Sequence, residues 1–210
     1  MTEAVFLDAL GTLVELEPPW IWLRPVVGDE VSEKELIAAV QVEMDYYKQH
    51  AHEGRDEASL ADLRNRCAEL LSRELGVEVS VEQLIDSVRF EAYSDSAPAL
   101  EKLGERGLKR VVVSNWDCSL GRVLERCGLA GRIDGAISSA EAGARKPDPA
   151  IFEPALALAG CGPDQALHVG DTAEEDVEAA RAAGIRVLLL DRDGGGDISS
   201  LAEIEEHLAA

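Results

Sequence analysis

The segment AVFLDALGTL (residues 4–13) begins with an unbroken apolar run and turns polar at Asp8. An apolar run without alternation is typical of a strand that is buried on both faces of a sheet. Four similar runs follow along the chain, at residues 110–113, 135–137, 166–169 and 185–190. Helical patterns lie between the later runs, at residues 97–106, 119–127, 149–159 and 174–183, and most of them end at a glycine. This alternation predicts an α/β fold in which helices flank a parallel sheet of five strands.

The long segment between the first and second apolar runs shows helical patterns only. Ser32 and Glu35 have the spacing of a capping box ahead of an amphipathic run. Further amphipathic runs cover residues 60–75 and 81–93. A helical insertion of this size is typical of a lid over a site. The expected boundaries are 1–14 and 94–210 for the core, 15–93 for the helical cap, and 15–19 and 94–98 for the two hinges.

The composition argues against partners that carry many negative charges. The chain of 210 residues has 20 Lys and Arg against 41 Asp and Glu, which gives a net charge of −21 at pH 7. Such a charge repels nucleic-acid backbones and anionic lipid headgroups, so we expect neither nucleic acid nor a membrane as a partner. The composition leaves the oligomeric state open.

Cysteine usage and hydropathy indicate the compartment. The four cysteines are scattered, without a CxxC pair, which predicts reduced thiols and a cytoplasmic location. The N-terminal segment lacks the basic start of a signal peptide, and Asp8 interrupts its apolar run. Since no run of about 18 apolar residues is present, we expect no membrane-spanning helix.

Polar residues follow four of the five predicted strands. In a parallel sheet, ligands bind at the carboxyl ends of the strands, so these residues are the candidates for a site. Carboxylates with open positions suit Mg²⁺, and an aspartate held by a metal and a lysine can attack phosphorus. The candidate residues are Asp8, Ser114, Asn115, Asp117, Lys146, Asp171 and Asp176.

The segments VFLDALGTL, VVVSNWD, GARKPDPAIF and HVGDTAEED, in this order and spacing, resemble the four signature motifs of the haloacid dehalogenase (HAD) superfamily. The resemblance covers essentially the whole chain, with the helical insertion where many members carry a cap. It implies a Rossmann-like core that binds Mg²⁺ and uses the first-motif aspartate as a nucleophile. Because most members are phosphatases, it also implies a small phosphorylated molecule as the substrate.

The resemblance assigns roles to individual residues of this chain. Asp8 would be the nucleophile and a Mg²⁺ ligand, and Leu10 would offer its backbone carbonyl to the metal. Ser114 and Asn115 would hold the phosphoryl group, while Lys146 would pair with Asp8 and with the phosphate. Asp171 would bind Mg²⁺, and Asp176 would support the metal indirectly or through water.

One position departs from the phosphatase pattern, which has a second aspartate where this chain has Leu10. General acid–base catalysis typically contributes about 10²–10⁴ in rate, so we expect slow turnover of ordinary alcohol leaving groups. Asp117, Glu15 and Glu17 are candidate substitutes for the missing acid.

Leu10 also keeps other functions open. Some relatives that lack this aspartate are dehalogenases, which attack carbon without a metal, or phosphonatases, which use a cap lysine. A third alternative is a catalytically impaired relative that binds phosphate or a partner. The intact Asp171 and Asp176 favour a magnesium-dependent enzyme among these alternatives.

Trp20 and Arg24 follow the first hinge and are candidates for substrate binding or for packing between cap and core.

Overall fold

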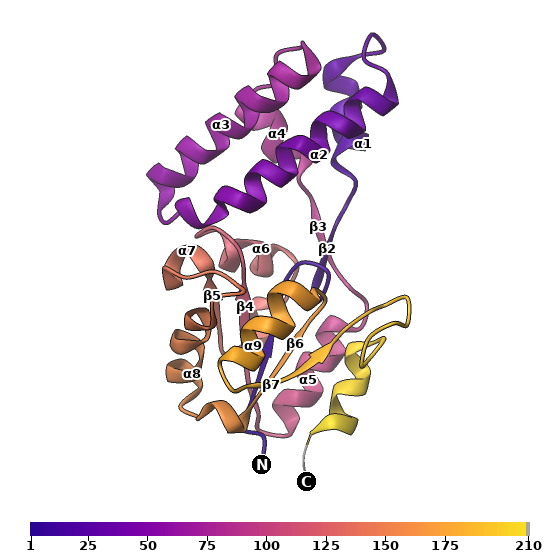
Figure 1. Ribbon diagram of the computed structural model, residues 1–210. Helices are drawn as coiled ribbons and strands as arrows, with labels where there is room; N and C mark the ends of the chain where they lie inside the picture. Colours follow the sequence, from indigo (N-terminus) through magenta and orange to yellow (C-terminus); the bar gives the residue numbers. More distant parts are fainter. Residues whose placement is uncertain (209–210) are drawn as a thin grey trace.

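The computed structural model describes residues 1–208. Its core is a five-stranded parallel sheet with helices on both faces (Figure 1). The strand order is β5-β4-β1-β6-β7, so β1 lies at the centre. All four residues of β1 are inaccessible to solvent, as expected for an unbroken apolar strand covered on both faces. The predicted α/β fold is confirmed. The strands are β1 (Ala4–Leu7), β4 (Lys109–Ser114), β5 (Gly135–Ser138), β6 (Ala166–Gly170) and β7 (Arg186–Leu189).

Two sets of helices cover the sheet. Val5 and Leu7 of β1 point to a core formed with α5, α6 and the 3₁₀ helix η6, whereas Ala4 and Phe6 point to η3, α8 and α9. Successive side chains of a strand alternate between faces, which explains this division. The bounds are α5 (Ser96–Glu105), α6 (Leu120–Arg126), η3 (Pro149–Phe152), α8 (Glu153–Ala159), α9 (Glu178–Ala182) and η6 (Leu201–His207).

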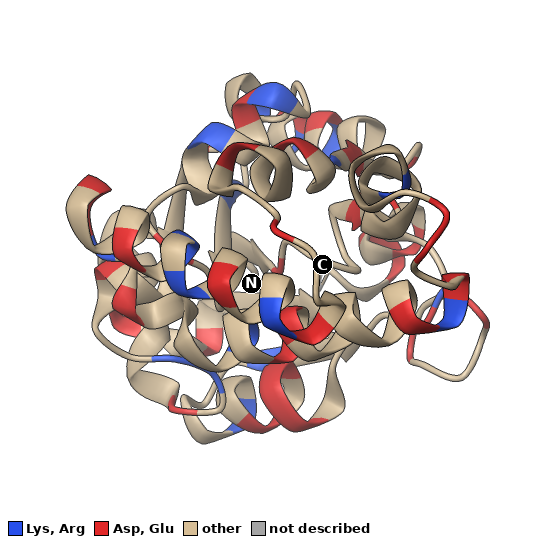
Figure 2. Cartoon of the chain, turned by 90° about the horizontal axis from the view of Figure 1, so that it is seen from above, with Lys and Arg blue, Asp and Glu red and all other residues tan. Residues whose placement is uncertain are grey.

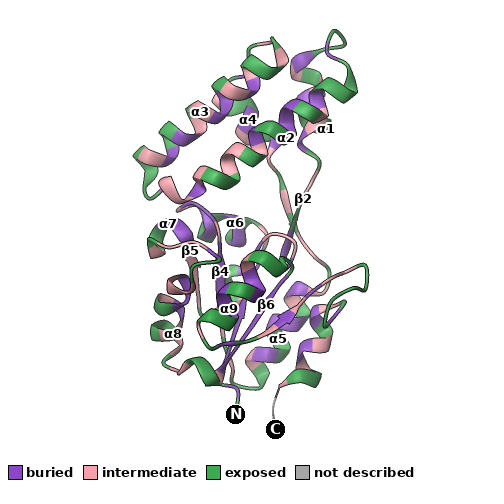
Figure 3. Cartoon of the chain, in the orientation of Figure 1, coloured by how far each residue is buried: buried purple, intermediate pink, exposed green. Residues whose placement is uncertain are grey.

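A helical insert, which we define as residues 17–89, lies over one end of the sheet (Figures 1 and 3). Each of its three later helices begins with a capping box, at Ser32, Asp56 and Ser80. The helices pack around their own apolar cluster, which includes Leu36 and Leu71. The helices are α1 (Pro19–Val27), α2 (Glu33–His50), α3 (Glu57–Leu75) and α4 (Val81–Ser87).

A short antiparallel ribbon joins the insert to the core, where the sequence predicted helix. The helix expected over residues 81–93 ends at Ser87, and β3 (Phe90–Ala92) follows it. β3 pairs with β2 (Val14–Leu16) in the register Val14↔Ala92 and Leu16↔Phe90. Each strand has three residues, too few to show a period of two, and each pairs with a segment far away in the sequence. Local patterns therefore could not reveal the ribbon.

The segment of the insert around Tyr47 and Gly54 contacts the core directly. The Tyr47 hydroxyl donates a hydrogen bond of 2.7 Å to Asp117 Oδ2, and the Cys118 amide donates one of 2.8 Å to the Gly54 carbonyl. A Cβ atom at Gly54 would lie 2.9 Å from the Cβ of Asp117, closer than such atoms approach. Glycine at this position lets the two parts meet.

Acidic residues are spread over many elements in the view of Figure 2, and basic residues lie among them. The negative net charge therefore belongs to the surface in general and not to one segment. None of the helices in residues 1–208 combines the length and the apolar character needed to cross a bilayer.

Candidate active site

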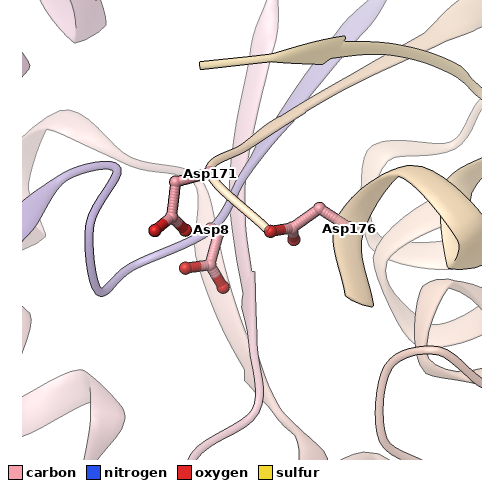
Figure 4. Close-up of side chains that lie close together, drawn as sticks. All are labelled: Asp8, Asp171 and Asp176. Atoms are coloured by element: carbon pink, nitrogen blue, oxygen red, sulfur yellow. The ribbon is translucent and has the colours of Figure 1, made fainter. Parts of the chain in front are cut away.

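The three aspartates predicted at the strand ends meet at one point of the sheet edge (Figure 4). Asp8 follows the central strand β1, and Asp171 follows its neighbour β6, in which Val169 is the partner of Leu7. Carboxylate oxygens of Asp8, Asp171 and Asp176 all lie within 4.8 Å of one another. Parallel pairing of β1 with β6 thus brings together residues that are far apart in the sequence.

A tight turn after Asp8 brings the backbone against Asp171. The amides of Leu13 and Val14 both donate to the Ala9 carbonyl, at 2.8 and 2.9 Å. Gly11 has φ 81°, and a Cβ atom there would lie 2.1 Å from Asp171 Oδ2. Only glycine provides both this conformation and this close approach without strain.

Lys146 lies at the centre of the site with a side chain that is 1% exposed. Its Nζ atom lies 2.5 Å from Asp8 Oδ1 and 2.5 Å from Asp176 Oδ1. Burial alone would lower the pKa of Lys146, but the charges of Asp8 and Asp176 outweigh it and raise the pKa. Lys146 therefore stays positively charged beside both carboxylates.

Asn115 holds the backbone of Lys146 in place. The Asn115 Oδ1 atom accepts from the Lys146 amide at 2.8 Å, and its Nδ2 atom donates to the Lys146 carbonyl at 3.0 Å and to Glu175 Oε2 at 2.9 Å. The side-chain amide is thus engaged with protein groups. Ser114 is buried at the end of β4, immediately before it.

Asp176 accepts hydrogen bonds from three donors. Its Oδ1 atom accepts from Lys146 and from His168 Nε2 at 2.8 Å, and its Oδ2 atom accepts from the Thr172 amide at 3.0 Å. Burial favours the neutral acid, but Lys146 and His168 outweigh it and lower the pKa of Asp176. A carboxylate with three donors is well suited to orient Lys146.

No pattern in the sequence indicates the contact between His168 and Asp176. His168 is completely buried, and its ring packs edge-on against Phe152 with centroids 4.9 Å apart. Its Nδ1 atom has no hydrogen-bond partner within residues 1–208. The Nε2 atom therefore carries the proton that reaches Asp176.

The charge balance of the cluster suits a divalent cation. Three carboxylates lie together, and the only Lys or Arg that pairs with any of them in the described chain is Lys146, which contacts Asp8 and Asp176. Burial and neighbouring carboxylates raise the pKa of Asp171, and they raise that of Asp8 to about 6 against the attraction of Lys146. A cation would relieve this repulsion, and hard oxygen ligands are those that Mg²⁺ prefers. The residues present thus fit a metal.

The remaining candidate acids are Asp117, Glu17 and Glu15. Both Asp117 oxygens accept hydrogen bonds, from the Tyr47 hydroxyl and from the Ser119 amide at 2.6 Å. The Glu17 carboxylate accepts from Trp22 Nε1 at 2.9 Å, and Glu15 is exposed on β2. None of these candidate acids makes a hydrogen bond to a group of the aspartate cluster in residues 1–208.

The structure does not bring Trp20 and Arg24 to the aspartates. Trp20 packs against the apolar cluster of the insert. Arg24 Nη1 donates to the carbonyls of Gly28 and Val31, at 3.0 and 2.6 Å. Both side chains therefore make contacts within the insert, and their roles in substrate binding remain predictions.

Replacing Lys146 with methionine is expected to destabilise the metal-free protein by about 3–5 kcal/mol, because buried carboxylates lose their counter-ion. Mg²⁺ should recover part of this loss, since binding to the folded state alone adds stability. The measurement is urea unfolding with EDTA and with Mg²⁺. The exposed Lys34→Met is the control, and equal stability losses in the two variants would contradict the expectation.

Comparison with known proteins agrees with this geometry. Residues 2–184 match the family of haloacid dehalogenase-like hydrolases. The chain is 41% identical over 106 residues to haloacid dehalogenase-like hydrolase domain-containing protein 3 of Danio rerio, which covers 50% of this chain and 44% of that protein. It is 36% identical over 105 residues to phosphoserine phosphatase of Thermus thermophilus, covering 50% and 42%. The chain thus spans less than half the length of these two curated relatives.

The fold is also that of solved structures. The L-2-haloacid dehalogenase of Xanthobacter autotrophicus, with chloropropionic acid covalently bound, superposes with a TM-score of 0.69 at 24% identity. The match covers 100% of this chain and 85% of that one. At this identity the likeness establishes the fold alone. With the family match over residues 2–184 and the aspartates gathered at the sheet edge, the chain belongs to the haloacid dehalogenase-like hydrolases.

Proposed function

We propose that this hydrolase is a magnesium-dependent phosphatase of a small phosphorylated metabolite, with Asp8 as the nucleophile. The observation that carries the proposal is the contact of Lys146 with Asp8 at 2.5 Å, inside a cluster of three aspartates. A lysine and a cation beside the nucleophile offset the charge of a phosphoryl group, which is the main requirement of this chemistry. The phosphatase among the relatives supports the same reaction class.

The protein groups would act in two steps. An Asp8 oxygen attacks phosphorus, the bond from phosphorus to the leaving oxygen breaks, and the leaving group departs with the electron pair. Water then attacks the phosphorus of the aspartyl phosphate, which releases inorganic phosphate and restores the Asp8 carboxylate. Lys146 orients Asp8 and neutralises phosphoryl oxygens, while Asp176 and Asn115 hold Lys146.

Mg²⁺ would contribute positive charge and orientation at the phosphoryl oxygens. Asp8 and Asp171 are the ligands that we propose, with the Leu10 carbonyl as a third. Asp176, whose oxygens already accept from three donors, would act indirectly or through water. Ser114, together with the backbone after it at Asn115, is proposed to hold the phosphoryl group.

Phosphate release from acetyl phosphate, aryl phosphates and alkyl phosphates tests this function. We expect release that requires Mg²⁺, is stopped by EDTA and is fastest with acetyl or aryl phosphates, because their leaving groups need no proton. Absence of release from the whole panel at saturating Mg²⁺ would overturn the proposal. Mass spectrometry of the intact protein would then identify a catalytically impaired relative, because such a protein would retain a phosphoryl adduct or bound phosphate without turnover.

Leu10 favours one second candidate, a dehalogenase that attacks carbon. Such an enzyme would release halide from 2-haloacids in the presence of EDTA. The three carboxylates around a single lysine argue against it, because this arrangement is costly without a cation. Halide release that survives chelation, without phosphate release, would select this candidate.

A further inference from the structure

A cavity of about 170 Å³ lies between the insert and the core. Its wall is mainly apolar, with contributions from the helices of the insert, the β2–β3 ribbon and the core loops. Residues that form this wall include Leu10, Leu23, Leu71, Phe90, Trp116 and Val123. A concave, mainly apolar space of this kind is the usual form of a small-molecule site.

The cavity borders the loops that carry the catalytic candidates. Leu10 follows Asp8 by two residues, and Asn115 follows Ser114 directly; both contribute to the wall. A phosphate ester with its phosphorus at Asp8 would therefore extend its organic part toward the apolar wall. This placement favours a leaving group with an apolar skeleton.

Two acidic side chains, Glu43 and Asp117, interrupt the mainly apolar wall, and only Asp117 already accepts hydrogen bonds on both oxygens, from Tyr47 and from the Ser119 amide. Glu43 of α2 is 7% exposed and lines the cavity on the same helix face as Val40, Met44 and Tyr47. Its carboxyl group lies beside the Cys67 thiol, and no Lys or Arg within residues 1–208 pairs with it. A buried polar group without a strong partner costs free energy, which a ligand can recover by a hydrogen bond.

The charges around Glu43 restrict what that ligand can be. Burial raises the pKa of Glu43, against a smaller lowering by the Cys67 thiol, so a negative charge on this group is costly without a partner. Lys48, Arg64 and Arg126 also line the cavity, together with one further carboxylate, Asp117, and this excess of positive charge over Asp117 disfavours an ammonium group there. A hydroxyl group, which can donate or accept, meets both conditions.

We propose that Glu43 is a specificity residue for substrates whose apolar leaving group carries a hydroxyl remote from the phosphate. The inference rests on the proposed function, because it places the phosphate at Asp8. It names the substrate class as hydroxylated, otherwise apolar phosphate monoesters. Small polar phosphates would leave the apolar wall and Glu43 without partners.

The kinetic test compares linear ω-hydroxyalkyl phosphates with alkyl phosphates of the same chain length. We expect the wild type to show a KM about tenfold lower for the hydroxylated member, as one hydrogen bond to a buried partner allows. Glu43→Leu should lose this preference, and the conservative Glu43→Gln should keep most of it. Asp45→Asn, on an exposed position of the same helix, should leave the preference unchanged.

A binding test keeps this inference separate from the proposed function. Calorimetry with ω-hydroxyalkyl and alkyl phosphonates reports affinity without turnover, in wild type and in Glu43→Leu protein whose fold is verified by circular dichroism. Tighter binding of the hydroxylated phosphonate by the wild type alone would support Glu43. Equal binding of the two phosphonates, together with hydrolysis of acetyl phosphate, would overturn the inference and leave the phosphatase proposal intact.

Discussion

Asp8→Asn is expected to reduce phosphate release by at least about 10⁴-fold, because the amide cannot serve as the attacking oxygen. The same variant should be more stable than the wild type at pH 7 in EDTA. Asp8 is 6% exposed and lies beside two other carboxylates, so its charge is costly when no cation is present. Loss of activity with a gain in stability distinguishes a catalytic group from a structural one.

The sign of this stability effect follows from the pKa of Asp8. Burial raises it from 3.8 to about 6 in the folded protein. Between these pH values the unfolded chain has released the proton while the folded protein keeps it, so stability falls as pH rises. The shift corresponds to at most about 3 kcal/mol, which is lost by pH 7 and which Asp8→Asn avoids.

Urea unfolding in EDTA from pH 4 to pH 8 measures this difference. The stability advantage of Asp8→Asn should grow through the interval and level off above pH 6. Lys146 and His168, which lower the pKa of Asp176, are present in both proteins. Asp86→Asn, at an exposed position of α4, is the control. An advantage that does not change with pH would contradict the assignment of the raised pKa to Asp8.

Leu10→Asp is expected to accelerate hydrolysis of alkyl phosphates by about 10²–10⁴-fold, the usual contribution of a general acid and base. Leu10 is half-buried two residues after Asp8 and lines the cavity that we assign to the leaving group. A carboxyl group there can protonate an alkoxide as it departs. Acetyl phosphate has a leaving group that needs no proton, so its departure step should change little.

Steady-state rates at saturating Mg²⁺ test this expectation, since a further carboxylate near the cluster would destabilise the metal-free protein. Leu10→Asn is the matched control, because it has nearly the same size as aspartate but cannot transfer a proton. Equal acceleration by the two variants would show that polarity, and not proton transfer, limits the wild type. No acceleration by Leu10→Asp would place the limiting step elsewhere.

The sequence predicts those parts of the structure that depend on local pattern and on the geometry of parallel sheets. Unbroken apolar runs identify all five strands, and residues that follow them converge because parallel strands end at one edge. The contacts of Lys146 with Asp8 and Asp176 agree with that expectation. The ribbon of β2 and β3 could not be predicted because its strands are short and lie far apart in the sequence.

The contacts of individual side chains are harder to predict than the places of their residues along the strands and helices. The engagement of Asn115 with the Lys146 backbone depends on rotamers that no sequence pattern encodes. The exposure of Glu43 to the cavity depends on how the insert lies over the core, and its position in α2 resembles any other on an amphipathic helix. Trp20 and Arg24 are close to the ribbon in sequence, but the first turns of α1 direct them into the insert.

The β2–β3 ribbon allows the helical insert to vary independently of the core. The Glu17 amide donates to the Arg89 carbonyl at 2.9 Å, so the chain leaves the core and returns to it at neighbouring points. The entropic cost of closing a loop rises only slowly with its length, by about 0.6 kcal/mol for each doubling. The helices of the insert can therefore change in length or composition while the core loops that carry Asp8, Lys146 and Asp171 keep their spacing.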